Sequence, residues 1–129
     1  TEKLKKLKYL FVSNSYPIVE GLARLFYDQG LRFFEKETNP HKMSGRLANS
    51  IPDILLLDNS IQEIDVFRLT PILKRNPNYK KIKVVMLVTR NEEGIIEAMI
   101  KNQVDRYLFF PFKGDDLFEI LESLLLEMN

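Results

Sequence analysis

The segment that most constrains the fold is residues 53–58, a run of four apolar residues between two aspartates. Apolar and polar residues do not alternate within it, as they would in a strand with one face in water. The run therefore predicts a strand that is buried on both faces, at the centre of a parallel sheet. In open α/β sheets the functional crevice lies beyond the carboxyl ends of the strands, so we expect Asp58 to stand in that crevice.

Other short apolar runs alternate along the chain with segments in which apolar residues recur at helical spacing. Repeated strand–helix units of this kind form parallel sheets with right-handed crossovers. The sequence therefore predicts an α/β fold in a single domain that spans residues 1–129. The expected strands are residues 9–12, 31–35, 53–58, 82–87 and 104–109. A helix is expected after each strand, the first from Pro17 to a stop at Gly30, the second within residues 41–50 and the third at residues 65–75.

Two local signals predict details of the later helices. Pro71 lies inside the third helix and is expected to kink or split it, with Thr70 as a local cap. Thr89 or Asn91 is expected to cap the fourth helix. These residues therefore carry structural interpretations before any functional one is considered.

The composition excludes several kinds of protein. The net charge of +1 gives no bulk electrostatic case for binding nucleic acid or a membrane surface. The chain has no cysteine, which excludes disulfides and thiolate metal sites, and its single histidine, His41, cannot form a histidine-rich site. No apolar run approaches the ~20 residues of a membrane helix. We therefore expect a cytoplasmic protein that contacts neither membrane nor nucleic acid directly.

Several residues follow one another in an order and spacing that resemble a known family. Asp58 ends the third strand, Asp65 precedes the third helix, Tyr107 lies in the fifth strand, and Pro111-Phe112 follows that strand. This pattern resembles the response-regulator receiver domain, the CheY-like, flavodoxin-like signalling module of bacterial two-component systems. The resemblance implies a (βα)5 three-layer sandwich with sheet order 2-1-3-4-5, and a phosphoacceptor aspartate at Asp58.

The same resemblance implies two further features. Receivers usually have a cis peptide bond at their Lys-Pro, so we expect a cis bond at Phe110–Pro111. Receivers also commonly associate through the face made by the fourth helix, fifth strand and last helix, here roughly residues 92–125. Arg106 and Tyr107 are expected on or near that face, which makes it the expected surface for a partner or for a homodimer.

The departures from the family pattern fall on the residues that carry its chemistry. Ser13 and Asn14 replace the acidic pair after the first strand, and Phe110 replaces the lysine before the proline. The switch hydroxyl after the fourth strand is replaced by Val88, with Thr89 one place later. The chain thus resembles a degenerate receiver, or pseudo-receiver. Smaller departures are Gln62 and Val66 for a proline and a glycine of the loop after Asp58, and Gln103 for a glycine.

These departures predict a pocket that is poor at phosphoryl transfer. Magnesium prefers anionic oxygen ligands, and a site with Ser13 and Asn14 in place of two carboxylates is two formal negative charges poorer. Phe110 cannot supply the positive charge that a lysine gives to a moving phosphoryl group. We therefore expect no catalytic residue, no enzymatic activity, and weak or absent Mg²⁺ binding. In this interpretation Asp58 is a polar residue at a strand end, capped by backbone N–H groups, and the alternative is a working phosphoacceptor.

The neighbouring positions leave alternatives open. Ser13 is expected to be a turn residue, because no base for a nucleophile is evident. Thr89 could restore the switch hydroxyl, but adjacent strand residues point to opposite faces, which favours the helix cap. Tyr107 either toggles between inward and outward positions or is simply an aromatic residue at the sheet edge. Two groups of lysines, at residues 3–8 and 80–83, fall at the N-terminal edge of the sheet and form either a patch for an anionic partner or a solvated rim.

Three functions compete at this point. The first is a degenerate receiver that acts in signal transduction by binding a partner protein or an attached output domain, without magnesium-dependent phosphorylation. The alternative is a functional receiver that accepts phosphate on Asp58. The third is a domain that binds a small molecule in the crevice. In the first case, Asp58→Asn is expected to leave partner binding nearly unchanged.

Overall fold

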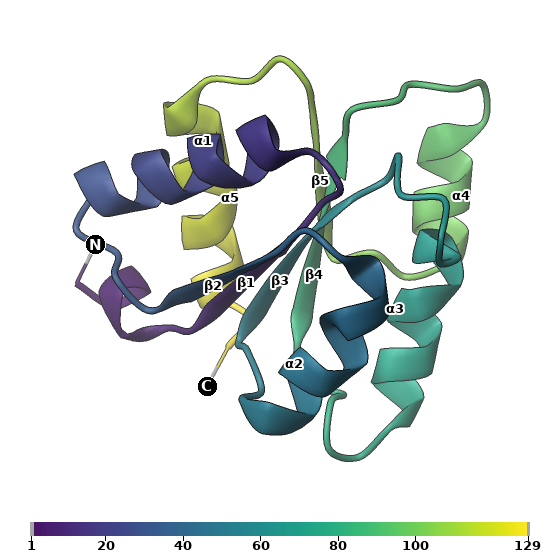
Figure 1. Ribbon diagram of the computed structural model, residues 1–129, viewed down its shortest axis with the longest axis horizontal. Helices are drawn as coiled ribbons and strands as arrows, with labels where there is room; N and C mark the ends of the chain where they lie inside the picture. Colours follow the sequence, from purple (N-terminus) through teal and green to yellow (C-terminus); the bar gives the residue numbers. More distant parts are fainter. Residues whose placement is uncertain (1, 129) are drawn as a thin grey trace.

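The computed structural model describes residues 2–128, in which five parallel strands form one sheet in the order β2-β1-β3-β4-β5 (Figure 1). This is the predicted flavodoxin-like order. The strands are β1 (Tyr9–Val12), β2 (Phe34–Glu37), β3 (Ile54–Asp58), β4 (Lys83–Val88) and β5 (Arg106–Phe109). The helices are α1 (Tyr16–Asp28), α2 (Met43–Asn49), α3 (Val66–Arg75), α4 (Ile95–Lys101) and α5 (Gly114–Leu125), with 3-10 helices η1 (Leu4–Lys6) and η2 (Pro40–Lys42).

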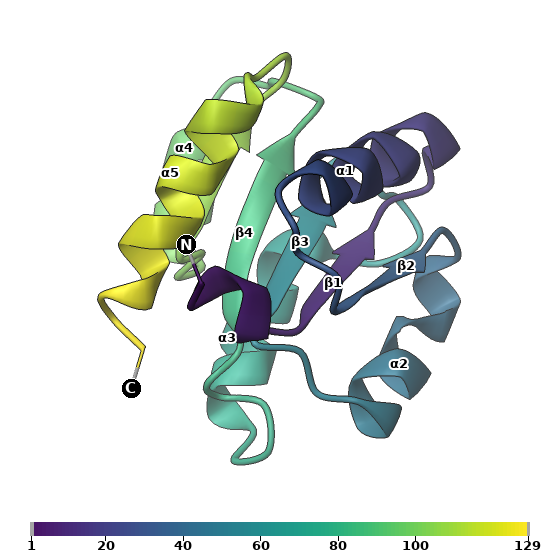
Figure 2. The same cartoon turned by 90° about the vertical axis from the view of Figure 1, so that its left-hand side faces the viewer.

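Helices cover both faces of the sheet, which gives three layers. α1 and α5 lie on one face, and α2, α3 and α4 lie on the other (Figure 1). Figure 2 shows α1 and α5 in front of the sheet, with strands visible between them. Because each strand is followed by a helix that returns along a face, the carboxyl ends of all the strands meet at one edge.

Strand β3 confirms the prediction from residues 53–58. All of its residues are buried, and their side chains alternate between the two layers. Ile54 and Leu56 pack toward α1 and α5, whereas Leu55 and Leu57 pack toward α2, α3 and α4. β1 and β4 flank β3 on both sides, so the run is at the centre of the sheet.

The second strand begins three residues later than predicted, and the end of α1 explains why. The Gly30 N–H donates to the Tyr27 carbonyl, and the Leu31 N–H donates to the Phe26 carbonyl. With Gly30 at φ 82°, this is the paired hydrogen-bond pattern that closes many helices. Leu31 is buried because it completes that closure, and the strand starts only at Phe34.

The prediction that Pro71 splits the third helix is wrong. Helix α3 runs unbroken from Val66 to Arg75, with Pro71 inside it and Asp65 as its N-cap. Thr70 is fully buried and its hydroxyl has no hydrogen-bond partner, so it is not a cap. Burial of Val66 and Leu73, one on each side of the proline, holds both halves of the helix against the sheet.

Helix α4 also begins differently from the prediction. Its N-cap is Gly94, in a left-handed conformation, and no side chain caps the helix. Ile95 and Met99 are buried, but Ile96 and Ile100 point outward with 40% and 68% of their surface exposed. The predicted cap residue Thr89 lies in the loop before the helix, and its hydroxyl donates to Asp58.

Candidate functional site

Asp58 ends β3 at the carboxyl edge of the sheet, as predicted, and its side chain is 1% exposed. β1 and β3 pair in parallel with Val12 opposite Leu57, so Ser13 follows β1 beside Asp58. β4 flanks β3 on the other side, with Leu87 opposite Asp58. The side chain of Asp58 therefore lies between the loops that follow β1 and β4.

Four hydrogen bonds reach the carboxylate of Asp58, three of them at Oδ1 and one at Oδ2. Oδ2 accepts a hydrogen bond from Ser13 Oγ at 2.6 Å, and Oδ1 accepts from Thr89 Oγ1 at 2.6 Å. Oδ1 also accepts from Ser60 N at 2.9 Å and from Ser60 Oγ at 2.8 Å. Among residues 2–128, Asp58 has no hydrogen bond or ion pair with a lysine or arginine, so hydroxyls and one backbone N–H stabilise it.

The predicted capping of Asp58 by backbone N–H groups is present at Ser60 N, and three hydroxyl groups, which were not predicted, add to it. The hydrogen bond from Thr89 overturns the interpretation of Thr89 as a helix cap. Leu56 and Leu87 point toward α1 and α5. Side chains two residues apart along extended chain point to the same side, so Asp58 and Thr89 lie on that side as well. Val88 points to the other side and packs in the layer of α2, α3 and α4. The hydroxyl that reaches Asp58 therefore comes from Thr89.

The Ser13 side chain also organises the turn into α1, as predicted for a turn residue. Its Oγ accepts a hydrogen bond from Ser15 N at 3.0 Å while it donates to Asp58. Ser15 in turn caps α1 through the Ile18 N–H. Ser13 therefore joins the start of α1 to Asp58.

Asn14, which the sequence predicts as the second replacement in the acidic pair, forms a hydrogen bond with Glu63 and none with Asp58. Its amide Nδ2 donates to Glu63 Oε2 at 2.7 Å, between the loops after β1 and β3. This hydrogen bond lowers the pKa of the exposed Glu63 carboxyl below its ordinary value. No group of three or more His, Cys, Asp or Glu side chains that could hold a metal ion occurs among residues 2–128.

Phe110, at the position of the family's lysine, belongs to an apolar wall. The Phe110–Pro111 bond is cis, which confirms the prediction. The rings of Phe110 and Phe112 meet edge to face, with centroids 4.7 Å apart. Together with Leu22 and Leu25 of α1 they line a groove of about 410 Å³. This position therefore brings an aromatic ring, and no charge, to the edge of the sheet.

Tyr107 lies on β5 with 36% of its surface exposed, and its ring meets that of Phe109 at 5.7 Å. Phe109 packs on the layer of α2, α3 and α4, whereas Phe110 and Phe112 pack on the other layer. The aromatic cluster after β5 is thus divided between the two cores. The outward position of Tyr107 is one of the two predicted positions, and movement between them stays a prediction.

The sequence interpretation missed two polar residues of this site. Ser60 supplies two of the four hydrogen bonds to Asp58, and Asn59 Oδ1 accepts from the backbone N–H groups of Thr89 and Arg90 at 2.9 and 3.1 Å. A signal was present for Ser60, because aspartate often accepts from the backbone N–H two residues later. The contact of Asn59 joins two loops and has no local signal.

The family follows from a comparison with models of known families. Residues 10–122 match the model described as "Response regulator receiver domain". The chain belongs to the response-regulator receiver family. It is therefore a receiver domain of a two-component system; receiver domains are in general non-enzymatic and interact with other proteins or output domains.

Individual relatives are distant in sequence. The chain is 24% identical over 118 residues to chemotaxis protein CheY of Listeria monocytogenes, covering 91% of this chain and 97% of that protein. It is 26% identical over 80 residues to the phosphate regulon transcriptional regulatory protein PhoB of Rhizobium meliloti, covering 62% of this chain and 35% of that protein. For the first three curated relatives, the match covers between 35% and 57% of their length.

A solved structure shares the fold. The signal receiver domain of a signal transduction histidine kinase from Syntrophus aciditrophicus superposes with a TM-score of 0.83 at 22% identity, covering 94% of this chain and 91% of that one. No helix within residues 2–128 is long and apolar enough to cross a membrane.

Proposed function

We propose that this domain is a pseudo-receiver that acts through protein–protein contacts and is not phosphorylated on Asp58 by the magnesium-dependent route. The observation that carries the proposal is the environment of Asp58, whose two oxygens accept four hydrogen bonds and which contacts no cation in the described part of the chain. A receiver aspartate must offer one oxygen to the metal and another to phosphorus. Here both oxygens are already engaged.

A metal ion or a phosphoryl group that binds Asp58 must displace hydrogen bonds that its carboxylate already accepts. A hydrogen bond to a charged group contributes about 1.5–3 kcal/mol, so freeing an oxygen of Asp58 costs an amount of that order. Magnesium gives up its water shell reluctantly and needs anionic ligands in return. Ser13 and Asn14 offer none, and Asn14 is turned to Glu63. We therefore propose that Mg²⁺ binds weakly or not at all.

Position 110 also lacks a positive charge, because it carries a phenylalanine. Phe110 packs in an apolar wall with Phe112 and Leu25, so the positive charge that would stabilise a transferring phosphoryl group is absent from that position. An anionic phosphoryl donor then approaches the Asp58 carboxylate with nothing to offset the repulsion between like charges, which reaches kcal/mol amounts at an effective protein dielectric.

One observation favours the alternative of a working phosphoacceptor. The Thr89 hydroxyl is 2.6 Å from Asp58, so a hydroxyl able to follow the state of the aspartate is present, although it lies one residue from the expected position. A phosphoryl group on Asp58 would have this hydroxyl as a hydrogen-bond donor. The two functions therefore differ in whether Asp58 reacts, and the experiment must measure that reaction.

The test is incubation with acetyl phosphate and excess magnesium, followed by intact-mass measurement. We expect no added phosphoryl group. The control is Asp58→Asn, which removes the acceptor oxygen while keeping the size of the side chain. A substantial phosphorylated fraction that disappears in the variant would establish the alternative function. In the proposed function, Asp58→Asn leaves partner binding nearly unchanged.

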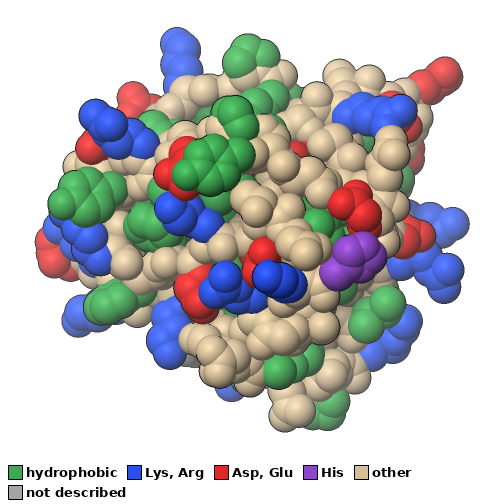
Figure 3. Space-filling view, viewed as in Figure 1, with side chains coloured by type: hydrophobic (Ala, Val, Ile, Leu, Met, Phe, Trp, Pro, Cys, Tyr) green, Lys and Arg blue, Asp and Glu red, His purple; other side chains and the backbone are tan. Residues whose placement is uncertain are grey.

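The face of α4, β5 and α5 is our proposed partner surface, and it also suits a homodimer. Ile96, Ile100 and Tyr107 are exposed on it. On the face seen in Figure 3, hydrophobic side chains are scattered among acidic and basic ones. Arg106 is a poor test residue, because its guanidinium bonds Ser123 and Glu127 within the domain. Ile100→Lys should weaken association, and Ile72→Lys, at an exposed isoleucine of α3, is the matched control.

A further inference from the structure

A charged groove lies at the N-terminal edge of the sheet, at the opposite end of the strands from Asp58. It has a volume of about 330 Å³ and is formed where β3 and β4 begin. Asp53 directly precedes β3, and Lys83 is the first residue of β4. The residues that line the groove are Asp53, Lys80, Lys81, Lys83, Glu127 and Met128.

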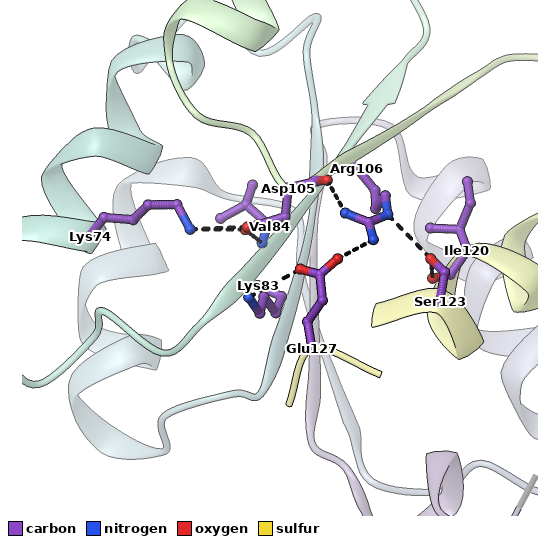
Figure 4. Close-up of polar contacts among 8 residues, drawn as sticks. All are labelled: Lys74, Lys83, Val84, Asp105, Arg106, Ile120, Ser123 and Glu127. Carbon is purple, nitrogen blue, oxygen red and sulfur yellow. Dashed lines mark hydrogen bonds and ion pairs between the residues drawn. The ribbon is translucent and has the colours of Figure 1, made fainter. Parts of the chain in front are cut away.

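Of the two carboxylates that line the groove, Asp53 and Glu127, the second is paired with cations. Figure 4 shows the Glu127 carboxylate between Arg106 and Lys83, with Oε1 3.5 Å from Lys83 Nζ and the other oxygen bonded to Arg106. The hydrogen bond from Arg106 holds the pKa of the Glu127 carboxyl below its ordinary value, so this carboxylate is charged at neutral pH. Glu127 follows α5 and remains 43% exposed, so a surface segment supplies this anion.

Two lysines of the groove have no such partner. Lys80 and Lys81 are exposed, and within residues 2–128 neither ammonium group forms a hydrogen bond or an ion pair. The Asp53 carboxylate at the end of the groove accepts a hydrogen bond from the Lys8 backbone N–H, Oδ2 to N 2.8 Å. The groove therefore combines a site where a carboxylate is already bound with neighbouring cations that are available to another anion.

We propose that this groove binds an acidic segment of a partner protein, whose carboxylates pair with Lys80 and Lys81 and compete with Glu127 for Lys83. The proposal goes beyond the pseudo-receiver function, because it concerns the N-terminal edge of the sheet, at the opposite end of the strands from Asp58. Glu127 acts as an internal competitor that lowers the affinity for the partner.

The arrangement of charge favours a peptide over a nucleic acid. Asp53 and Glu127 lie among the lysines, and a continuous row of phosphates would meet these carboxylates as well as the cations. Aspartate and glutamate side chains on a flexible segment reach individual lysines and avoid the acidic positions. The chain itself occupies the groove with a glutamate, which shows the geometry that such a side chain adopts.

The experiment measures binding of a fluorescein-labelled decaglutamate peptide by fluorescence anisotropy at low salt. We expect binding that is lost at 0.5 M NaCl, where exposed ion pairs are screened, since the Debye length is then only about 4 Å. Lys80→Gln with Lys81→Gln should weaken binding about fivefold, because two exposed ion pairs are removed. Glu127→Gln should tighten binding about threefold by removing the competitor.

Matched control variants distinguish an effect of the groove on peptide binding from an effect of the net charge of the domain. Lys42→Gln with Lys113→Gln makes the same change in net charge at exposed lysines elsewhere, and Glu93→Gln matches Glu127→Gln. Neither control should change the affinity by more than about twofold. Thermal unfolding of each variant checks that it is folded.

Three results would overturn the proposal. The first is the absence of peptide binding at low salt, and the second is equal weakening in the two double variants. The third is tighter binding of a ten-residue thymidine oligonucleotide that depends on the same lysines, which would assign the groove to nucleic acid. A Glu127→Gln variant with unchanged affinity would refute the role of Glu127 as a competitor.

Discussion

Ser13→Ala tests whether hydroxyl groups take the place of cations around Asp58. Among residues 2–128, Ser13 Oγ is the one donor to Asp58 Oδ2, at 2.6 Å, and both side chains are 1% exposed. Removing the hydroxyl leaves a buried, charged oxygen without a partner. Because hydrogen bonds to charged groups contribute about 1.5–3 kcal/mol, and Ser15 N–H also loses its acceptor, we expect the free energy of unfolding to fall by about 2–3 kcal/mol.

The assay is urea unfolding followed by circular dichroism and by tyrosine fluorescence, since the chain has five tyrosines and no tryptophan. Ser44→Ala, at an exposed position of α2, is the matched control and should change stability by less than about 0.5 kcal/mol. At the size of this domain the loss in Ser13→Ala corresponds to a fall in melting temperature of roughly 6–12 °C.

A double-mutant cycle with Asp58→Asn shows whether the loss of stability in Ser13→Ala arises from the charge of the Asp58 carboxylate. In the Asp58→Asn background the bond to Ser13 joins neutral groups, so Ser13→Ala should cost only about 1 kcal/mol. The difference between backgrounds is the coupling energy, about 1–2 kcal/mol. If Ser13→Ala costs under about 0.5 kcal/mol, or costs the same in both backgrounds, the reasoning about Asp58 is refuted.

Two other predictions concern buried polar groups away from the site. Thr70→Val should stabilise the domain by about 1 kcal/mol in urea unfolding, because the buried Thr70 hydroxyl has no partner, and a loss of stability would show that it has one. Burial raises the pKa of Glu37, but hydrogen bonds from Arg46 and from the Asn39 N–H outweigh it and hold the pKa below the ordinary 4.5. The stability that ionised Glu37 contributes is therefore complete above pH 4.5, and it is lost as the pH falls through the lowered pKa of Glu37. The wild type should therefore lose more stability between pH 6 and pH 3 than the Glu37→Gln variant does.

The main elements of the fold were predictable because their signals are local. The uninterrupted apolar run of β3 and the repeated strand–helix pattern depend on residues that are close in sequence, and the structure has the predicted strand order. Errors arose where local rules competed with packing. Leu31 has the hydrophobicity of a strand residue but closes α1, and Pro71 would break an isolated helix but lies in one held by the buried Val66 and Leu73.

The candidate site was predicted in part, and the part that failed depends on register. The position of Asp58 at a strand end follows from the sequence, as do the replacements Ser13 and Phe110. The contact between Thr89 and Asp58 joins residues 31 apart. It requires the pairing of β3 with β4 and the phase of each side chain along its strand, and one residue of difference moves a side chain to the other layer.

The sequence by itself determined the class of fold, the central position of β3, the aspartate at its end, and the presence of Ser13, Asn14 and Phe110 where we expect charged partners in a receiver. It did so because periodicity and turn residues act over a few positions, and because an absent lysine or carboxylate is absent in every conformation. Only the tertiary structure decided which groups replaced those partners. Ser13 and Thr89 meet Asp58, and Glu127 meets Lys83, through contacts between residues far apart in the chain. Such contacts depend on strand register and on the paths of the loops, which a local pattern does not contain.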